Sequence, residues 1–124
     1  MALPKPGHAV RGSRTGRPIM AVLDLLGRRW ILRILWELRG EQLGFRTLQG
    51  RCDDMSPSVL SQRLSDLQEA QLVQRTAEGW YGLTRTGQDL LTALAPLQLW
   101  AERWAELVAG KDGTPMQEAN KASD

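Results

Sequence analysis

One short segment in the middle of the chain restricts the fold more than any other. Ser56-Pro57 is a strong helix start, because a serine side chain can cap free backbone amides and proline suits the first helical position. Leu60, Leu64 and Leu67 follow at the i, i+4, i+7 spacing of one helix face, and the opposite face is polar. The sequence therefore predicts a helix over residues 56–69, with a surrounding domain that covers its apolar side.

Apolar residues at helical spacing predict three more helices ahead of this one. They cover about residues 19–26, 29–39 and 45–51, and a glycine or a turn follows each of them. Trp30 and Trp36 are expected in the core of the domain. The short helix over 45–51 and the helix after it have the lengths and the tight connection of a helix-turn-helix.

Beyond the central helix, residues 72–83 predict a β-hairpin whose turn is Ala77-Glu78-Gly79. Thr84 can cap a last helix, which either kinks at Pro96 or resumes after it and continues to Val108. This order predicts a winged helix-turn-helix, a mostly α fold with a small β-hairpin wing (α+β) and additional helices at both ends. The expected organisation is a flexible basic leader over 1–17, this domain over 18–108 and a flexible tail over 109–124.

The chemistry-bearing residues are too few and too scattered for an enzyme. The 124 residues include one cysteine, Cys52, and one histidine, His8, so neither an internal disulfide nor a Cys/His zinc site can form. His8 lies in a Gly/Pro/Arg-rich stretch where nothing would orient a catalytic base. No apolar run is long enough for a membrane helix or a signal peptide. We therefore expect a cytoplasmic protein that is no enzyme and needs no cofactor or metal.

Charge is unevenly distributed along the chain, although the net charge is only +2. The leader carries +4 from Lys5, Arg11, Arg14 and Arg17, residues 56–86 are neutral, and residues 87–110 carry −2. A nucleic-acid partner would thus be recognised by Ser, Gln and a few Arg side chains, not by bulk charge. The leader arginines would either contact DNA, along the backbone or in a minor groove, or remain a solvated tail.

The polar face of the 56–69 helix suits contact with base edges in a DNA major groove. Glutamine can pair with adenine and arginine with guanine, while the free amides at the helix start suit a phosphate. An ordinary surface helix also has a polar face, but the short helix before it, the hairpin after it and nearby arginines favour a recognition helix. The predicted DNA-binding residues are Arg46, Ser56, Ser58, Ser61, Gln62, Arg63, Arg75 and Arg85.

A series of short motifs, in order over about residues 17–104, resembles the HxlR-type winged-helix transcriptional regulators. The stretch LQEAQLV at 67–73 resembles the L-E-E-A-G-L-V of that family, and YGLTRTG at 81–87 its Y-x-L-T-x-x-G. The other matching stretches are LDLLGRRW followed by ILRIL at 23–35, FRTL at 45–48, SPSVLSQRL at 56–64, and the L-x-x-W of Leu97 and Trp100.

The resemblance implies a bacterial, sequence-specific DNA-binding regulator that acts as a homodimer on a palindromic operator. Two recognition helices would enter successive major grooves of double-stranded DNA roughly 34 Å apart. The N-terminal and the long C-terminal helix would form the dimer, through Ile19, Val22, Leu23, Leu97, Trp100 and Trp104. For the two tryptophans the alternative is a place in the core.

Two features depart from the family pattern. Many members carry a cysteine before the proline that opens the first helix, whereas this chain has Arg17-Pro18, so sensing of oxidants by that residue is not expected. Cys52 is expected to be a buried structural residue, with a thiol pKa raised by its acidic neighbours and opposed by Arg51. The wing is short and has Glu78 at its tip, which leaves Arg75, Arg85 and Trp80, as a stacking or packing group, for any contact.

Two alternatives stay open. A winged-helix domain can serve as a protein-interaction module without binding DNA, and the acidic terminal helices and the indoles would supply its surface. A regulator of this type can also respond to a small-molecule effector in a pocket between the dimer helices, near Trp100 and Trp104.

Overall fold

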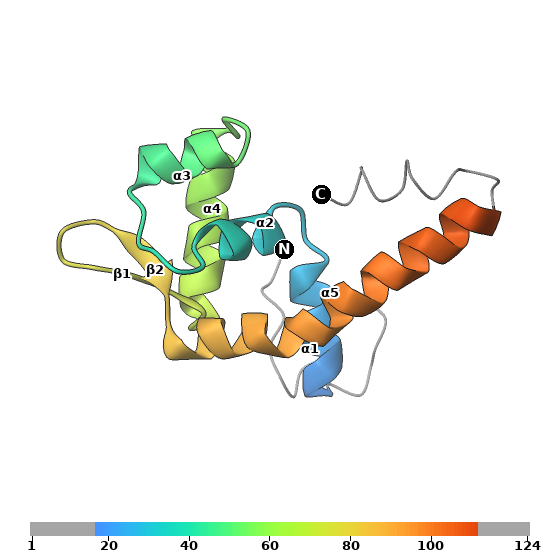
Figure 1. The fold of residues 1–124 in the computed structure, drawn as a ribbon. Helices are drawn as coiled ribbons and strands as arrows, with labels where there is room; N and C mark the ends of the chain where they lie inside the picture. The colour runs from blue at the N-terminus through green and yellow to red at the C-terminus, as the bar shows by residue number, and fades with distance from the viewer. Residues whose placement is uncertain (1–16, 112–124) are drawn as a thin grey trace. The chain divides into compact units, whose positions relative to one another are not determined.

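The computed structural model describes residues 17–111, so all of the leader except Arg17, and the tail from residue 112, lie outside the described residues. The described chain forms five helices and one antiparallel hairpin, in the predicted order (Figure 1). Their bounds are α1 Pro18–Leu26, α2 Ile31–Glu37, α3 Phe45–Arg51, α4 Pro57–Glu69, β1 Val73–Arg75, β2 Tyr81–Leu83 and α5 Arg85–Lys111. None of the described helices combines the length and apolar character of a membrane span.

The chain divides into two compact units, with the boundary inside α5 between Asp89 and Leu90. The first unit holds α1 to α4, both strands and the first turn of α5, and it contains the fully buried leucine and isoleucine side chains. Each such side chain contributes about 1.5–3 kcal/mol of hydrophobic stabilisation. The fully buried aliphatic residues are Ile31, Ile34, Leu35, Leu38, Leu48, Leu60, Leu64 and Leu67.

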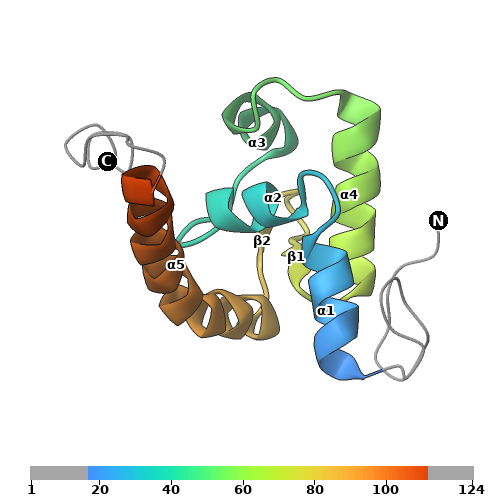
Figure 2. The ribbon, with the colours of Figure 1, turned by 90° about the vertical axis from the view of Figure 1, so that its right-hand side faces the viewer.

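The predicted start of α4 is confirmed. The Ser56 hydroxyl accepts a hydrogen bond from the Val59 amide at 3.5 Å, and Pro57 occupies the first helical position. Leu60, Leu64 and Leu67 face inward as the periodicity predicts. Helix α4 is the longest helix of the first unit. A short connection joins it to α3 (Figure 2).

Helix α2 is shorter than its predicted span of 29–39. Trp30 precedes it with φ 77°, in the left-handed region, so the chain turns sharply at this residue and cannot be helical there. Trp36 is 40% exposed, which corrects its expected place in the core. Its ring is covered on one face by the guanidinium of Arg39, 3.7 Å from the ring centroid.

The wing is the predicted hairpin, with Val73 opposite Leu83 and Arg75 opposite Tyr81. The backbone of Leu43 pairs with Tyr81 through two hydrogen bonds of 2.8 and 2.7 Å, so an extended residue before α3 flanks the hairpin. At the turn, Gly79 has φ +90°, which glycine adopts without strain, and its amide donates to the Thr76 carbonyl at 2.9 Å. The hairpin is therefore closed tightly at its tip and held along one edge.

Helix α5 is one helix from Arg85 to Lys111, with Pro96 inside it. The sequence left open whether this proline kinks or interrupts the helix; the helix is not interrupted there. Thr84 caps it as predicted, since its hydroxyl accepts a hydrogen bond from the Gly87 amide at 3.0 Å. The same hydroxyl donates to the Gln71 carbonyl at 2.7 Å and so ties the helix start to the end of α4.

Candidate nucleic-acid interface

A tight corner joins α3 to α4 and sets the angle of the helix-turn-helix. Asp53 and Asp54 both have positive φ, 58° and 53°, a conformation that aspartate tolerates better than most residues. The Gln49 side-chain amide donates to the Met55 carbonyl at 2.9 Å, and Met55 itself is buried. The corner is thus fixed by local hydrogen bonds and by the buried side chain of Met55.

The start of α4 exposes the polar side chains that were predicted to read DNA. Ser58, Ser61 and Gln62 are exposed, and so is the capping Ser56, whose hydroxyl lies 2.9 Å from that of Ser58. These short side chains leave the first two turns of the helix accessible to a partner. Three of the predicted base contacts therefore share one accessible stretch of helix.

Asp66, one turn further along α4, fixes the side chains of Gln62 and Arg63. It was not predicted as a site residue from the sequence. Its carboxylate accepts from the Gln62 amide at 3.0 Å and from the Arg63 guanidinium at 3.2 Å. The first bond orients the Gln62 side chain and leaves its carbonyl oxygen toward solvent or a partner. The signal is visible in hindsight, because an acid four residues after a glutamine and three after an arginine pairs with both on a helix.

Arg63 is engaged inside the protein. Its Nε donates to the carbonyl of Arg29 at 3.0 Å, so the guanidinium connects α4 to the turn between α1 and α2. Its side chain is only 25% exposed. In this arrangement Arg63 positions α4, and a contact with a base would require both of its bonds to be exchanged.

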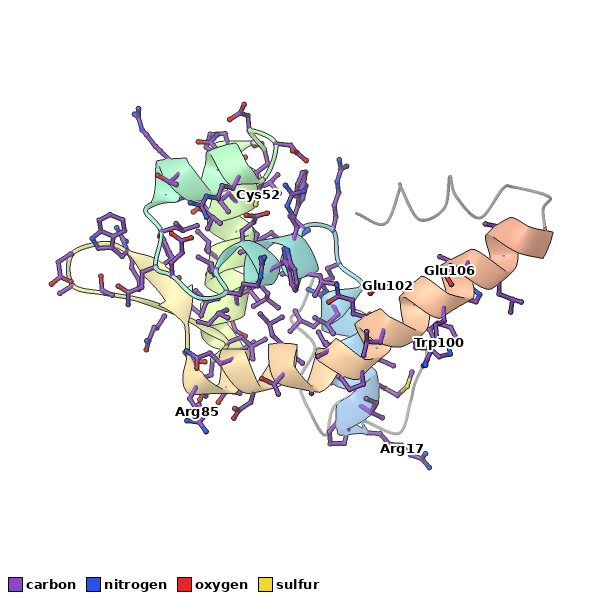
Figure 3. All side chains as sticks on the ribbon, in the orientation of Figure 1. Arg17, Cys52, Arg85, Trp100, Glu102 and Glu106 are labelled. Carbon is purple, nitrogen blue, oxygen red and sulfur yellow. The ribbon has the colours of Figure 1, made fainter. Side chains whose placement is uncertain are left out.

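The remaining predicted arginines differ in how free they are. Arg46 is exposed on α3, and within residues 17–111 no hydrogen bond or ion pair engages its guanidinium. The Arg75 guanidinium lies 5.5 Å from the centroid of the Tyr81 ring. Arg85 projects into solvent at the start of α5 and pairs with exposed Asp89 at 3.1 Å, a contact of little energetic weight (Figure 3).

Cys52 is completely buried at the end of α3, as the sequence predicted (Figure 3). Burial raises the pKa of its thiol, with smaller contributions in the same direction from Glu37 and Asp53, whereas Arg33 lowers it. The opposing cation is thus Arg33 and not the expected Arg51. A buried, protonated thiol is a poor nucleophile and a poor redox sensor. No cluster of potential metal ligands occurs in the part of the chain that the structure describes.

Two helix faces carry large apolar side chains that nothing in the described chain buries. On α1, Ile19 and Leu23 are exposed and Val22 is half-buried. On α5, Trp100 (Figure 3) and Trp104 are 52% and 54% exposed, so neither belongs to the core. Their rings stack with centroids 5.8 Å apart. Other exposed apolar residues on the same helix are Leu97, Leu99, Leu107 and Val108.

The apolar residues of α5 recur in a specific pattern. Leu97, Ala101, Trp104 and Val108 are separated by four, three and four residues, which places them along one seam of the helix. Alternating intervals of four and three are typical of helices that pair lengthwise with another helix. Glu102 and Glu106 project from α5 outside this seam (Figure 3).

Comparison with known proteins assigns the chain to a family. The chain is 28% identical over 90 residues to YvaP from Bacillus subtilis, an uncharacterized helix-turn-helix transcriptional regulator, covering 68% of this chain and 83% of YvaP. A second uncharacterized regulator of this type, from Methanocaldococcus jannaschii, is 25% identical over 91 residues, or 70% of this chain and 85% of the relative.

Solved structures agree with these relatives. Quinone-bound YodB from Bacillus subtilis superposes with a TM-score of 0.65 at 27% identity, covering 68% of this chain and 96% of YodB. A putative transcriptional regulator of the MarR family from Enterococcus faecalis gives a TM-score of 0.69 at 25% identity, covering 81% of this chain and 96% of that protein. The HxlR-like helix-turn-helix family matches residues 25–109. The chain therefore belongs to the HxlR-like helix-turn-helix family, which consists of DNA-binding transcriptional regulators and not of enzymes.

Proposed function

We propose that the protein works in the cytoplasm as a homodimer that recognises a palindromic operator with the exposed start of α4. The observation that carries this proposal is the accessible row of Ser58, Ser61 and Gln62, with Gln62 held in one orientation by Asp66 at 3.0 Å. A glutamine fixed in this way can present its amide to an adenine edge without a further loss of side-chain freedom. Ser56, at the helix N-terminus, suits a DNA phosphate.

The surrounding arginines supply the nonspecific part of the interaction. Arg46, with no internal partner in the described chain, is the best placed of them to reach a phosphate. Arg63 contributes by holding α4 against the α1–α2 turn. Arg75 and Arg85 add positive charge around the wing, which makes binding depend on salt concentration.

The test is selection from a random DNA library, followed by binding measurements on the selected duplex. An enriched inverted repeat is expected, and Gln62→Ala should weaken binding to it by about tenfold, the loss of one bidentate base contact. Gln68→Ala is the matched control, because Gln68 is an exposed glutamine near the other end of the same helix. If no sequence is enriched, the chain is better explained as a protein-interaction module.

A second function, response to a small molecule, is supported by the exposed stacked pair of Trp100 and Trp104. A flat aromatic molecule can stack on such indoles, and the similar protein YodB has a quinone-bound structure. Since Cys52 is buried, any quinone response in this chain would use noncovalent stacking. Titration calorimetry with a panel of quinones would show heat of binding that Trp100→Ala removes; no measurable heat from any of them contradicts this function.

A further inference from the structure

The backbone on both sides of Trp80 is fixed by the turn that closes the wing. The Thr76 amide donates to the Trp80 carbonyl at 2.8 Å, and the Trp80 amide donates to the Thr76 hydroxyl at 3.1 Å. The turn between them is closed by the Gly79–Thr76 bond described above. Trp80 is therefore presented from a rigid position and not from a loose loop.

The indole of Trp80 lies on the polar side of the hairpin. Neighbouring residues of a strand point to opposite faces, and Tyr81 is 8% exposed whereas Trp80 is 48% exposed. On the same face lie Thr76, opposite Trp80, and exposed Gln74. Gly82, in contrast, is covered by the side chain of Gln42. None of the aromatic or cation–aromatic contacts within residues 17–111 involves Trp80.

The tip of the wing offers no net charge to a partner. The turn is Ala77-Glu78-Gly79, so its one ionised side chain repels phosphate. The guanidinium of Arg75 lies over the ring of Tyr81 and reaches the turn beside Gly79, where it offsets the charge of Glu78. What the tip does offer is a large apolar ring with a single N–H donor.

We propose that Trp80 is the DNA contact of the wing, and that its indole enters the minor groove beside the major groove occupied by α4. There the ring packs against deoxyribose, and its N–H donates to the purine N3 or pyrimidine O2 acceptors of the groove floor. Because α4 packs against β1, the wing and the recognition helix engage the duplex as one body. This inference rests on the proposed DNA-binding function.

The apolar nature of this contact gives it a signature in salt titrations. With the full chain and the duplex enriched from the random library, Trp80→Ala should weaken binding by about tenfold, the effect of losing one large apolar contact. The slope of log affinity against log salt should stay unchanged, because no cation has been removed. Trp80→Phe should retain most of the affinity and lose only the N–H contact.

Trp36→Ala is the matched control, since Trp36 is a similarly exposed indole in the same unit and is expected to leave DNA affinity unchanged. Fluorine NMR of the full chain labelled with fluorotryptophan supplies a second measurement that needs no variant to bind DNA. The Trp80 resonance, assigned by its absence in Trp80→Phe, should shift when the duplex is added. The Trp36 resonance should stay in place.

The inference is overturned if the affinity of Trp80→Ala for the duplex is within twofold of that of the unchanged chain, or if the Trp80 resonance does not shift. It is also overturned if Trp80→Ala alters the oligomeric state, because the indole would then contact a second copy. In those cases Gln62→Ala still weakens binding and the proposed function stands. If no duplex is enriched at all, the proposed function fails and this inference fails with it.

Discussion

Single residues with an unusual backbone conformation form the corners of this fold. Trp30, Asp53, Asp54 and Gln71 all have positive φ, and each lies where one helix gives way to the next segment. Aspartate accepts this conformation at modest cost, whereas tryptophan and glutamine adopt it only against a steric penalty. The corners of the first unit are therefore places where backbone strain is offset by packing.

Gln71→Gly should stabilise the protein. Gln71 has φ 64°, and glycine occupies the corresponding position of the family motif quoted above. Removing its β-carbon should raise the free energy of unfolding by about 1 kcal/mol. Urea denaturation measures this change. Gln68→Gly, inside α4, is the control and should lower it by about the same amount; if both variants are destabilised alike, the conformation of Gln71 costs nothing.

Cys52 should make stability fall at alkaline pH. Its thiol pKa is raised on folding by burial, so the native state retains a proton that the unfolded chain releases above about pH 8.5. The contribution of the protonated thiol is complete below that pH and is lost as pH rises through the folded-state pKa. Urea denaturation between pH 7 and 10 should show a decline that is smaller in Cys52→Ala. Equal declines in both proteins would contradict this.

At the scale of the elements, the sequence predicted those bounds that a side chain or a periodic apolar face determines. The bounds of α3 and α4 were predicted closely, because a turn follows the end of α3 and the Ser56-Pro57 cap marks the start of α4. The start of α2 was missed, since nothing in the pattern signals a left-handed Trp30. Arg63 shows the same limit at the site, because one of its two partners is a backbone carbonyl 34 residues away, whereas the pairing with Asp66 follows from the sequence spacing.

Gly87→Ala should disrupt the junction between α5 and the wing. A β-carbon at Gly87 would collide with the carbonyl oxygen of Leu72, which belongs to the backbone and cannot move aside easily. The expected loss is about 1–3 kcal/mol in the free energy of unfolding. Gly110→Ala is the control, because open space surrounds Gly110 and alanine favours a helix. A thermal unfolding midpoint for Gly87→Ala as high as that of the unchanged protein would mean that the contact relaxes at no cost.

At the scale of the whole molecule, the apolar faces of α1 and α5 are best explained by a second copy of the chain. Apolar residues at intervals of four and three along α5, most of them exposed, form a seam that another helix would cover. The palindromic operator that we propose requires the same two-fold symmetry. This part of the proposal depends on assembly, which the sequence indicates through the family resemblance and through the excess of apolar residues on one face of the last helix.

Trp104→Glu should convert the proposed dimer to monomer at micromolar concentration, because it places a charge in the seam where a large aromatic contact is expected to contribute about 2 kcal/mol or more. Sedimentation velocity measures the outcome. Leu99→Glu is the matched control, since Leu99 is equally exposed on the same helix but lies roughly 140° around it from Trp104. A dimer that survives Trp104→Glu would place the interface elsewhere.

The distribution of the five tryptophans has an optical consequence. Trp36, Trp80, Trp100 and Trp104 all face solvent to a large extent in the described chain. Most of the intrinsic fluorescence of an isolated chain therefore comes from hydrated indoles, so the wavelength of maximum emission changes little on denaturation. Binding of a second copy or of a duplex would exclude water from those rings and shift the emission to shorter wavelength. The tryptophans therefore serve as an intrinsic fluorescent probe of assembly.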